Sequence, residues 1–142
     1  MRVFVFRVFG LPVAQARPRA FVLHGHASVY DPKTSRSWKE TVRAQAIDAW
    51  RPCGESAWSG AIQLDLVFFL PRPKTLPKRV TYHTKRPDLD NLVKPIKDAL
   101  RGLVYLDDSQ VNLLKARKLY ASAADPSGVR VVVERSKSEA SG

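Results

Sequence analysis

The chain has 142 residues, of which 24 are lysine or arginine and 13 are aspartate or glutamate, so its formal net charge is +11. A chain of this length forms one domain with a substantial core, and its single cysteine, Cys53, excludes an intrachain disulfide. Three scattered histidines without cysteine partners argue against a zinc site. The apolar segment 1–10 is interrupted by Arg2 and Arg7, which argues against a signal sequence or a membrane span. We therefore expect a cytoplasmic protein without a membrane partner, whose basic surface attracts phosphate backbones.

Three short segments near the start of the chain have strand patterns. Residues 3–9 are apolar on both alternating faces, which predicts a strand buried inside a sheet. Residues 21–23 and 28–30 flank a His-Gly-His turn and predict a β-hairpin. The sequence DPKT at 31–34 is a second turn signal.

A helix is predicted next, from residue 37 to about residue 51. Ser37 and Glu40 have the spacing of a capping box. The apolar side of this helix would cover one face of the sheet and consists of Trp38, Val42, Ile47 and Trp50.

The second half of the chain alternates strands with one more helix. Residues 61–70 predict a strand, and the connection 71–87 that follows is basic, rich in proline and too long for a simple link unless it is functional or disordered. Residues 111–121 and 129–135 are separated by the turn DPSG and predict a terminal β-hairpin. The helix is predicted over residues 91–101, with an inward side formed by Leu92, Val93, Ile96, Ala99 and Leu100.

Five of the thirteen acidic residues lie between residues 86 and 111, and all five are aspartates. Carboxylates beside phosphates repel them unless a divalent cation lies between, because like charges at short range destabilise each other. Arg86 precedes Pro87, which favours extended backbone, so we predict that Asp88 and Asp90 point to the same side and that the helix begins at residue 90 or 91.

This pattern of acids is typical of a magnesium site. Mg²⁺ prefers oxygen ligands, so Asp88, Asp90 and Asp108 would form a site that phosphate oxygens and water complete. Lys94 lies four residues after Asp90 and could stabilise the negative charge that develops on a phosphate in the transition state. The sequence therefore points to metal-dependent chemistry on a nucleic acid.

Each of these residues also has an ordinary structural interpretation. Asp88 and Asp90 could cap the helix, and the aspartates at 107–108 could belong to a simple turn. Lys94 could pair with Asp90 and Asp98, which lie four residues before and after it. For Asp98 the ion pair on the helix is the expected role.

The segment DLDNLVKPIKDAL at 88–100, followed by LDDSQV at 106–111, resembles the RusA family of Holliday junction resolvases. The shared features are a DxDN segment, a lysine four residues after its second aspartate, and an aspartate pair after the helix. PVAQARPRA, VYDPKTSRSWKETV and the terminal strands are also similar, so the resemblance covers nearly the whole chain. Together with the predicted elements it implies a single α/β (α+β) domain over residues 1–136, with a mixed β-sheet covered by two main helices, followed by a disordered tail at 137–142.

The resemblance also implies roles for individual residues. Asp88, Asp90 and Asp108 would be the catalytic metal ligands, with Asp107 as an adjacent candidate, and Lys94 would be the catalytic lysine. The cofactor would be Mg²⁺ or Mn²⁺, and the protein would be a bacterial or phage homodimer that makes paired nicks in a four-way DNA junction. Eight basic residues that precede the aspartates of the acidic segment are expected to contact phosphates: Arg17, Arg19, Arg72, Lys74, Lys78, Arg79, Lys85 and Arg86.

Two other functions agree with the same residues. A metal-dependent nuclease could act on other branched or single-stranded nucleic acids, and it would then prefer that substrate in competition. A non-catalytic basic DNA-binding protein would bind without metal and without nicking.

Overall fold

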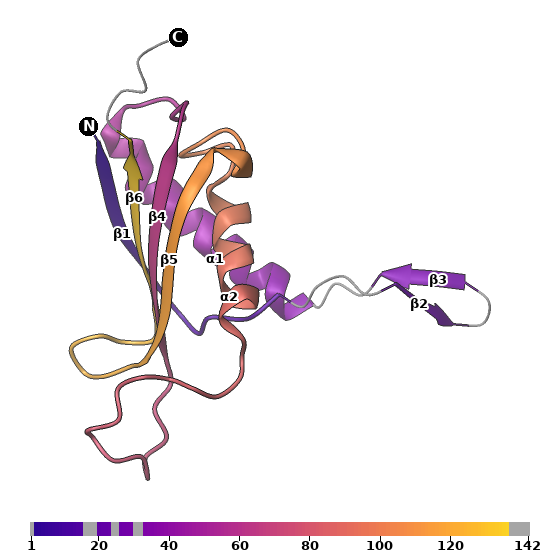
Figure 1. Cartoon of the computed structure of the whole chain (residues 1–142), viewed down its shortest axis with the longest axis vertical. Helices are drawn as coiled ribbons and strands as arrows, with labels where there is room; N and C mark the ends of the chain where they lie inside the picture. The colour runs from indigo at the N-terminus through magenta and orange to yellow at the C-terminus, as the bar shows by residue number, and fades with distance from the viewer. Residues whose placement is uncertain (1, 16–19, 24–25, 30–32, 137–142) are drawn as a thin grey trace.

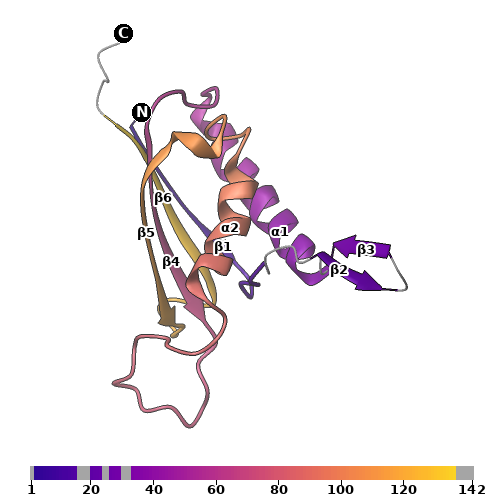
Figure 2. The same cartoon turned by 45° about the vertical axis from the view of Figure 1, so that its right-hand side comes forward.

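The computed structural model describes residues 2–15, 20–23, 26–29 and 33–136. They form an α+β domain in which two helices cover one face of a four-stranded mixed sheet, as the sequence predicts (Figures 1 and 2). The elements in chain order are β1 (Val3–Phe9), β2 (Ala20–Leu23), β3 (His26–Val29), α1 (Lys33–Trp50), the 3₁₀ turn η1 (Arg51–Cys53), β4 (Ile62–Leu70), α2 (Leu89–Leu100), the 3₁₀ turn η2 (Asp108–Gln110), β5 (Val111–Tyr120) and β6 (Gly128–Arg135).

The strands of the main sheet lie in the order β1-β6-β4-β5. Strand β6 is antiparallel to both β1 and β4, whereas β5 is parallel to β4. The predicted terminal hairpin between β5 and β6 is therefore wrong, because β4 lies between them. The burial of both faces near the end of β4 agrees with this placement. Val67 and Phe69 lie on the face away from the helices and are 1 % and 4 % exposed, which is typical of a strand with a neighbour on each side.

Strand β1 is an edge strand with one buried face, and the prediction that both faces are buried is wrong. Phe4, Phe6 and Val8 pack under the helices, while Val5 and Phe9 on the other face are 56 % and 54 % exposed. The helices lie on the side of Phe4, Phe6 and Val8 (Figure 2), so Val5 and Phe9 on the second side of this edge strand stay at the surface.

Helix α1 begins at Lys33, four residues before the predicted start, so the predicted capping box at Ser37 does not form the helix start. The early start adds another turn to the buried side, and Ser35 is 1 % exposed there. The buried side consists of Ser35, Trp38, Val42, Ala46 and Trp50, while the predicted Ile47 is only partly buried.

Helix α2 buries the five predicted apolar residues and also Pro95. Proline has no N–H, so the carbonyl of Asn91 loses its helical partner. The backbone N–H of Gln15 donates to this carbonyl at 2.9 Å instead. Gln15, in the segment after β1, thus supplies the hydrogen bond that Pro95 cannot donate. Helix α2 continues past Pro95 without a break.

The predicted hairpin near the start of the chain is confirmed: β2 and β3 pair with each other as a separate antiparallel sheet. Residues 30–32, which contain Tyr30 and part of the predicted DPKT turn, and the predicted tail at 137–142 lie outside the described residues. Within the part of the chain that the structure describes, no helix is long and apolar enough to cross a membrane.

Candidate functional site

The acidic segment enters helix α2 one residue earlier than predicted. Asp88 is the N-cap residue in extended conformation, with φ −70° and ψ 143°, and its side chain makes no capping hydrogen bond. Asp90 already belongs to the first helical turn, so the prediction that both aspartates share one extended segment is wrong. The physical reason is Leu89, which packs against the core at helical spacing from Leu92 and Val93.

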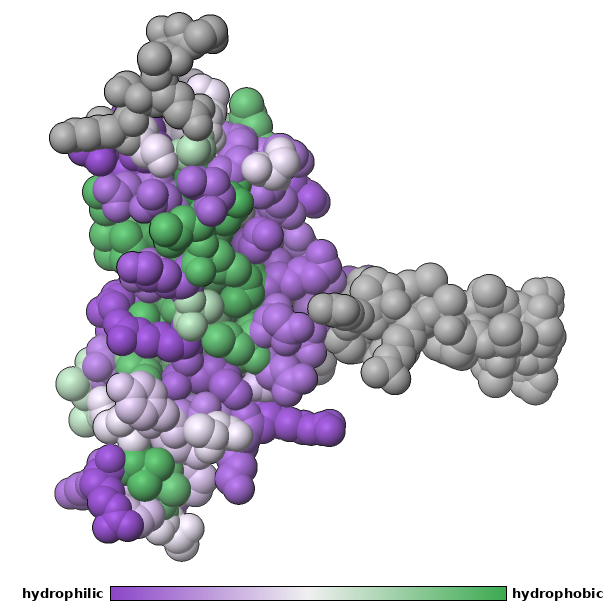
Figure 3. Space-filling model, in the orientation of Figure 1, coloured by the Kyte–Doolittle hydropathy of each residue, from purple (hydrophilic) through white to green (hydrophobic). Residues whose placement is uncertain are grey.

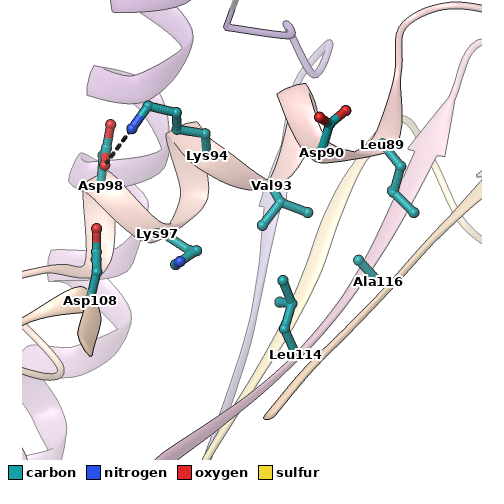
Figure 4. A pocket seen from close by; sticks show the side chains of 9 residues that line it. All are labelled: Leu89, Asp90, Val93, Lys94, Lys97, Asp98, Asp108, Leu114 and Ala116. Carbon is teal, nitrogen blue, oxygen red and sulfur yellow. Dashed lines mark ion pairs between the residues drawn. The ribbon is translucent and has the colours of Figure 1, made fainter. Parts of the chain in front are cut away.

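A pocket of about 610 Å³ lies between α2 and the edge strand β5 (Figure 4). Its apolar wall combines Leu89 and Val93 of the helix with Leu114 and Ala116 of the strand. Its polar lining consists of Asp90, Lys94, Lys97, Asp98 and Asp108. The pocket therefore brings together two of the three predicted metal ligands and the predicted catalytic lysine, whereas Asp88 stands just before the helix and does not line it.

The carboxylates lie toward opposite ends of this pocket. Asp90 is on the first turn of α2, and Figure 4 shows Asp98 and Asp108 toward the far end. Asp98 lies eight positions after Asp90, which corresponds to a helical rise of about 12 Å. The structure thus places acids from both chain segments in one pocket without bringing Asp90 to Asp108.

Asp98 links the two helices. Its carboxylate forms ion pairs with Lys94 at 3.9 Å and with Lys39 of α1 at 3.5 Å. Its side chain is only 13 % exposed. The predicted helical pair with Lys94 is confirmed. The pair with Lys39 was not predicted, because it joins residues that are distant in sequence and leaves no local pattern.

The two aspartates before β5 have different surroundings. Asp107 caps η2: its carboxylate accepts from the N–H of Ser109 at 3.2 Å and from the hydroxyl of Ser109, and the Gln110 side chain accepts from the N–H of Asp107 at 2.8 Å. The Ser109 hydroxyl, together with this backbone N–H, lowers the pKa of Asp107. Asp108 instead lines the pocket, with Oδ2 3.6 Å from Arg101 and with Oδ1 buried and without a hydrogen-bond partner among the residues that the structure describes.

These positions limit how a cation could bind. Among the described residues, no three His, Cys, Asp or Glu side chains lie close enough together to hold one metal ion. Mg²⁺ binds oxygens at about 2.1 Å, so a single ion cannot join Asp90 to Asp108 in this arrangement. Mg²⁺ sites with one or two carboxylates, water and substrate phosphates are common, and such a site fits the donors present, including the unpartnered Oδ1 of Asp108. The metal-binding and catalytic roles of Asp88, Asp90, Lys94 and Asp108 stay predictions.

The basic residues expected to contact DNA divide into two groups. Arg72 is turned inward, where its guanidinium donates to the carbonyls of Pro77, Lys78 and Val80 at 2.6–2.9 Å. This internal role differs from the predicted phosphate contact, which proximity in sequence alone suggested. Arg17 and Arg19 lie outside the described residues. The others have exposed side chains: Lys74, Lys78, Arg79, Lys85 and Arg86.

We call the connection 71–87 the basic loop. Side chains of strand β5 hold its C-terminal end. The ammonium group of Lys118 donates to the carbonyls of Lys85 and Pro87 at 2.7 and 2.8 Å. The His83 ring lies 4.7 Å from the Tyr120 ring, and burial, followed by the charge of Lys118, lowers the pKa of His83. Sequence reasoning missed these anchors, because neither Lys118 nor Tyr120 has a neighbouring residue that signals a distant loop.

The match to a family model decides the family: the model of endodeoxyribonuclease RusA matches residues 10–134. This chain belongs to the RusA family. It is 38 % identical over 126 residues to the uncharacterized protein YqaN of Bacillus subtilis (strain 168), covering 82 % of this chain and 87 % of the relative. It is also 29 % identical over 118 residues to the crossover junction endodeoxyribonuclease rusA of Lactococcus phage r1t, covering 82 % of this chain and 86 % of the relative. The predicted family is thereby confirmed, and the family is one of endodeoxyribonucleases.

Proposed function

We propose that this RusA-family chain resolves four-way DNA junctions by paired phosphodiester cleavage and that it requires Mg²⁺ or Mn²⁺. The observation that carries the proposal is the pocket between α2 and β5, in which Asp90, Asp108 and Lys94 from the two family motifs share one lining. Carboxylates concentrated in one pocket of a chain with net charge +11 suit a site that handles phosphates through a cation.

The lysines and the aspartates of the pocket would have different roles in cleavage. Lys94, whose side chain is 48 % exposed, and Lys97 line the pocket and would attract a phosphate and stabilise the charge of the transition state. Asp90 with Asp88 at the start of α2, or Asp108 at the other end, would hold the cation. A bound divalent cation would supply an activated water and would neutralise charge at the phosphate.

We further propose that the protein acts as a homodimer, because two symmetric cuts require two pockets. The sheet face opposite the helices offers a surface for a second copy (Figure 3). Val3 and Val5 of β1 and Leu113 of β5 are 43 %, 56 % and 38 % exposed on this face. Val3 and Val5 are neighbours on β1, whereas Glu134 and Gln63 lie between Val3 and Leu113 across the sheet. Exposed apolar side chains that are grouped as Val3 and Val5 are can mark an interface.

Val5→Arg tests this surface. The added charge should convert the dimer to a monomer in sedimentation equilibrium, while Arg36→Gln on the exposed side of α1 should leave the mass unchanged. If Val5→Arg sediments as the wild type does, this face is not the dimer interface.

The function itself is tested with a synthetic four-way junction and a linear duplex of the same sequence, each with Mg²⁺ or with chelator. We expect symmetric nicks in the junction only when Mg²⁺ is present. Metal-independent binding without nicks would point to a DNA-binding protein, and preferred cutting of flaps or single strands would point to a different nuclease substrate.

A further inference from the structure

The basic loop carries one aromatic side chain that the proposed chemistry does not use. Tyr82 is 68 % exposed, which is unusual for a tyrosine in a folded domain. The loop contains six basic residues and no acidic one, so the ring lies in a strongly cationic segment. An exposed aromatic ring among cations is the combination by which proteins bind unpaired nucleotides: the cations contact the backbone and the ring stacks on a base.

The backbone around Tyr82 is held against the end of β5. Tyr82 forms an isolated antiparallel bridge with Leu119. On one side of it the carbonyl of Thr81 accepts from the N–H of Tyr120 at 2.9 Å, and on the other the N–H of His83 donates to the carbonyl of Lys118 at 3.1 Å. Two backbone hydrogen bonds thus position the residue while its ring projects from the surface.

The remainder of the loop is stabilised from inside. Arg72 donates to three carbonyls of the loop, and its guanidinium lies 5.5 Å from the centre of the Tyr120 ring. Arg72, rather than the exposed lysines and arginines of the loop, makes these internal hydrogen bonds. The exposed cations therefore stay available to phosphates. A stacking residue needs such support, since a platform that is already ordered loses less conformational entropy on binding.

The loop leads directly into the candidate site. Lys118 donates to the carbonyl of Pro87, the residue before Asp88, and α2 begins one residue later. Figure 1 shows the loop at the end of the sheet from which α2 starts. Tyr82 therefore lies at the same end of the molecule as Asp88 and Asp90.

We propose that Tyr82 stacks on a DNA base that is unstacked at the branch point and so contributes to the preference for branched over linear DNA. The inference rests on the proposed function for its substrate. In a linear duplex each base is already stacked on both neighbours, whereas extruding a base costs least where pairing or stacking is interrupted. The ring thus has a partner at a branch and none along an intact duplex.

The test measures binding in chelator, so that no strand is cut. Fluorescence anisotropy compares the wild type with Tyr82→Ala and Tyr82→Phe on a four-way junction and on the matched duplex. Tyr82→Ala should bind the junction about tenfold more weakly and the duplex equally well, because one base stack is lost. Tyr82→Phe keeps the ring and should bind as the wild type does. Equal weakening on both DNAs, or junction binding by Tyr82→Ala within twofold of the wild type, overturns the proposal.

A second measurement identifies the contact. Junctions with one abasic nucleotide at each position beside the branch are titrated with the wild type and with Tyr82→Ala. At the stacked position, removal of the base should weaken the wild type about tenfold and leave Tyr82→Ala unchanged, which is the non-additivity expected of a direct contact. Additive losses at every position contradict stacking.

These results separate the inference from the proposed nuclease function. Weaker junction binding by Tyr82→Ala, with no cutting by the wild type in Mg²⁺, would refute the nuclease and keep the stacking residue. Cutting by the wild type, with unchanged junction binding by Tyr82→Ala, would refute the stacking residue and keep the nuclease.

Discussion

The pocket beside α2 and the basic loop are positioned by different forces. The pocket rests on the core, because Leu92 and Ile96 on the opposite side of its helix are completely buried. The loop is held mainly by hydrogen bonds from Arg72 and Lys118 to backbone carbonyls and buries few large side chains. Core packing gives one well-ordered geometry, whereas a loop held by polar contacts depends more on salt and pH. We therefore expect the pocket to determine the chemistry and the loop to determine binding.

The largest difference between an effect on cleavage and an effect on binding is expected at Asp90. Asp90→Asn should abolish cleavage in Mg²⁺ and leave junction binding equal or tighter, because it removes a negative charge that repels phosphate. The stability cost should be small, about 0.3–1 kcal/mol for a charge lost near a helix N-terminus. Single-turnover cleavage, anisotropy and thermal unfolding measure the three effects. Weaker binding together with normal cutting would contradict the proposed division of roles.

Lys94→Ala should slow the single-turnover cleavage rate about 10²-fold, the magnitude typical of a lost electrostatic stabiliser, with little change in binding. Lys39→Ala is the matched control, since Lys39 pairs with the same Asp98 and does not line the pocket. The control should cut at close to the wild-type rate. A similar loss in both variants would mean that Asp98, rather than contact between Lys94 and phosphate, accounts for the effect.

In the loop, Lys85→Gln combined with Arg86→Gln should reduce the slope of log Kd against log salt by about two units if both side chains contact phosphates. The carbonyl of Lys85, to which Lys118 donates, is retained in this variant. Lys115→Gln with Arg117→Gln removes two exposed cations from β5 and should leave the slope unchanged. An unaltered slope in the first pair would leave Lys85 and Arg86 as ordinary surface charges.

The smallest effect is expected from His83. Its pKa is below the ordinary value of 6.5, so below pH 6.5 the unfolded chain binds more protons than the folded one. The free energy of unfolding should therefore fall as the pH drops through 6.5 toward the folded-state pKa. Urea unfolding at pH 7.5 and 5.5 should show a larger loss for the wild type than for His83→Gln. Identical losses would show that His83 does not contribute to this pH dependence.

Much of the local structure could be predicted because each element shows its buried side in a short stretch of sequence. The inward residues of α2 follow from helical periodicity, and the bounds of β4 and β6 follow from apolar runs that end at turn residues. The motif around Asp88 and Asp90 identified the family, because it is a pattern of residues along the chain and needs no distances.

Tertiary structure decided which segments meet. It placed β4 between β5 and β6, turned Arg72 toward its own loop, and gave Gln15 the helical carbonyl that Pro95 leaves without a partner. It also placed Asp90 and Asp108 toward opposite ends of one pocket. Local periodicity determines which side of an element is buried, but the choice of partner depends on contacts between residues far apart in the chain, and no short stretch of sequence encodes those contacts.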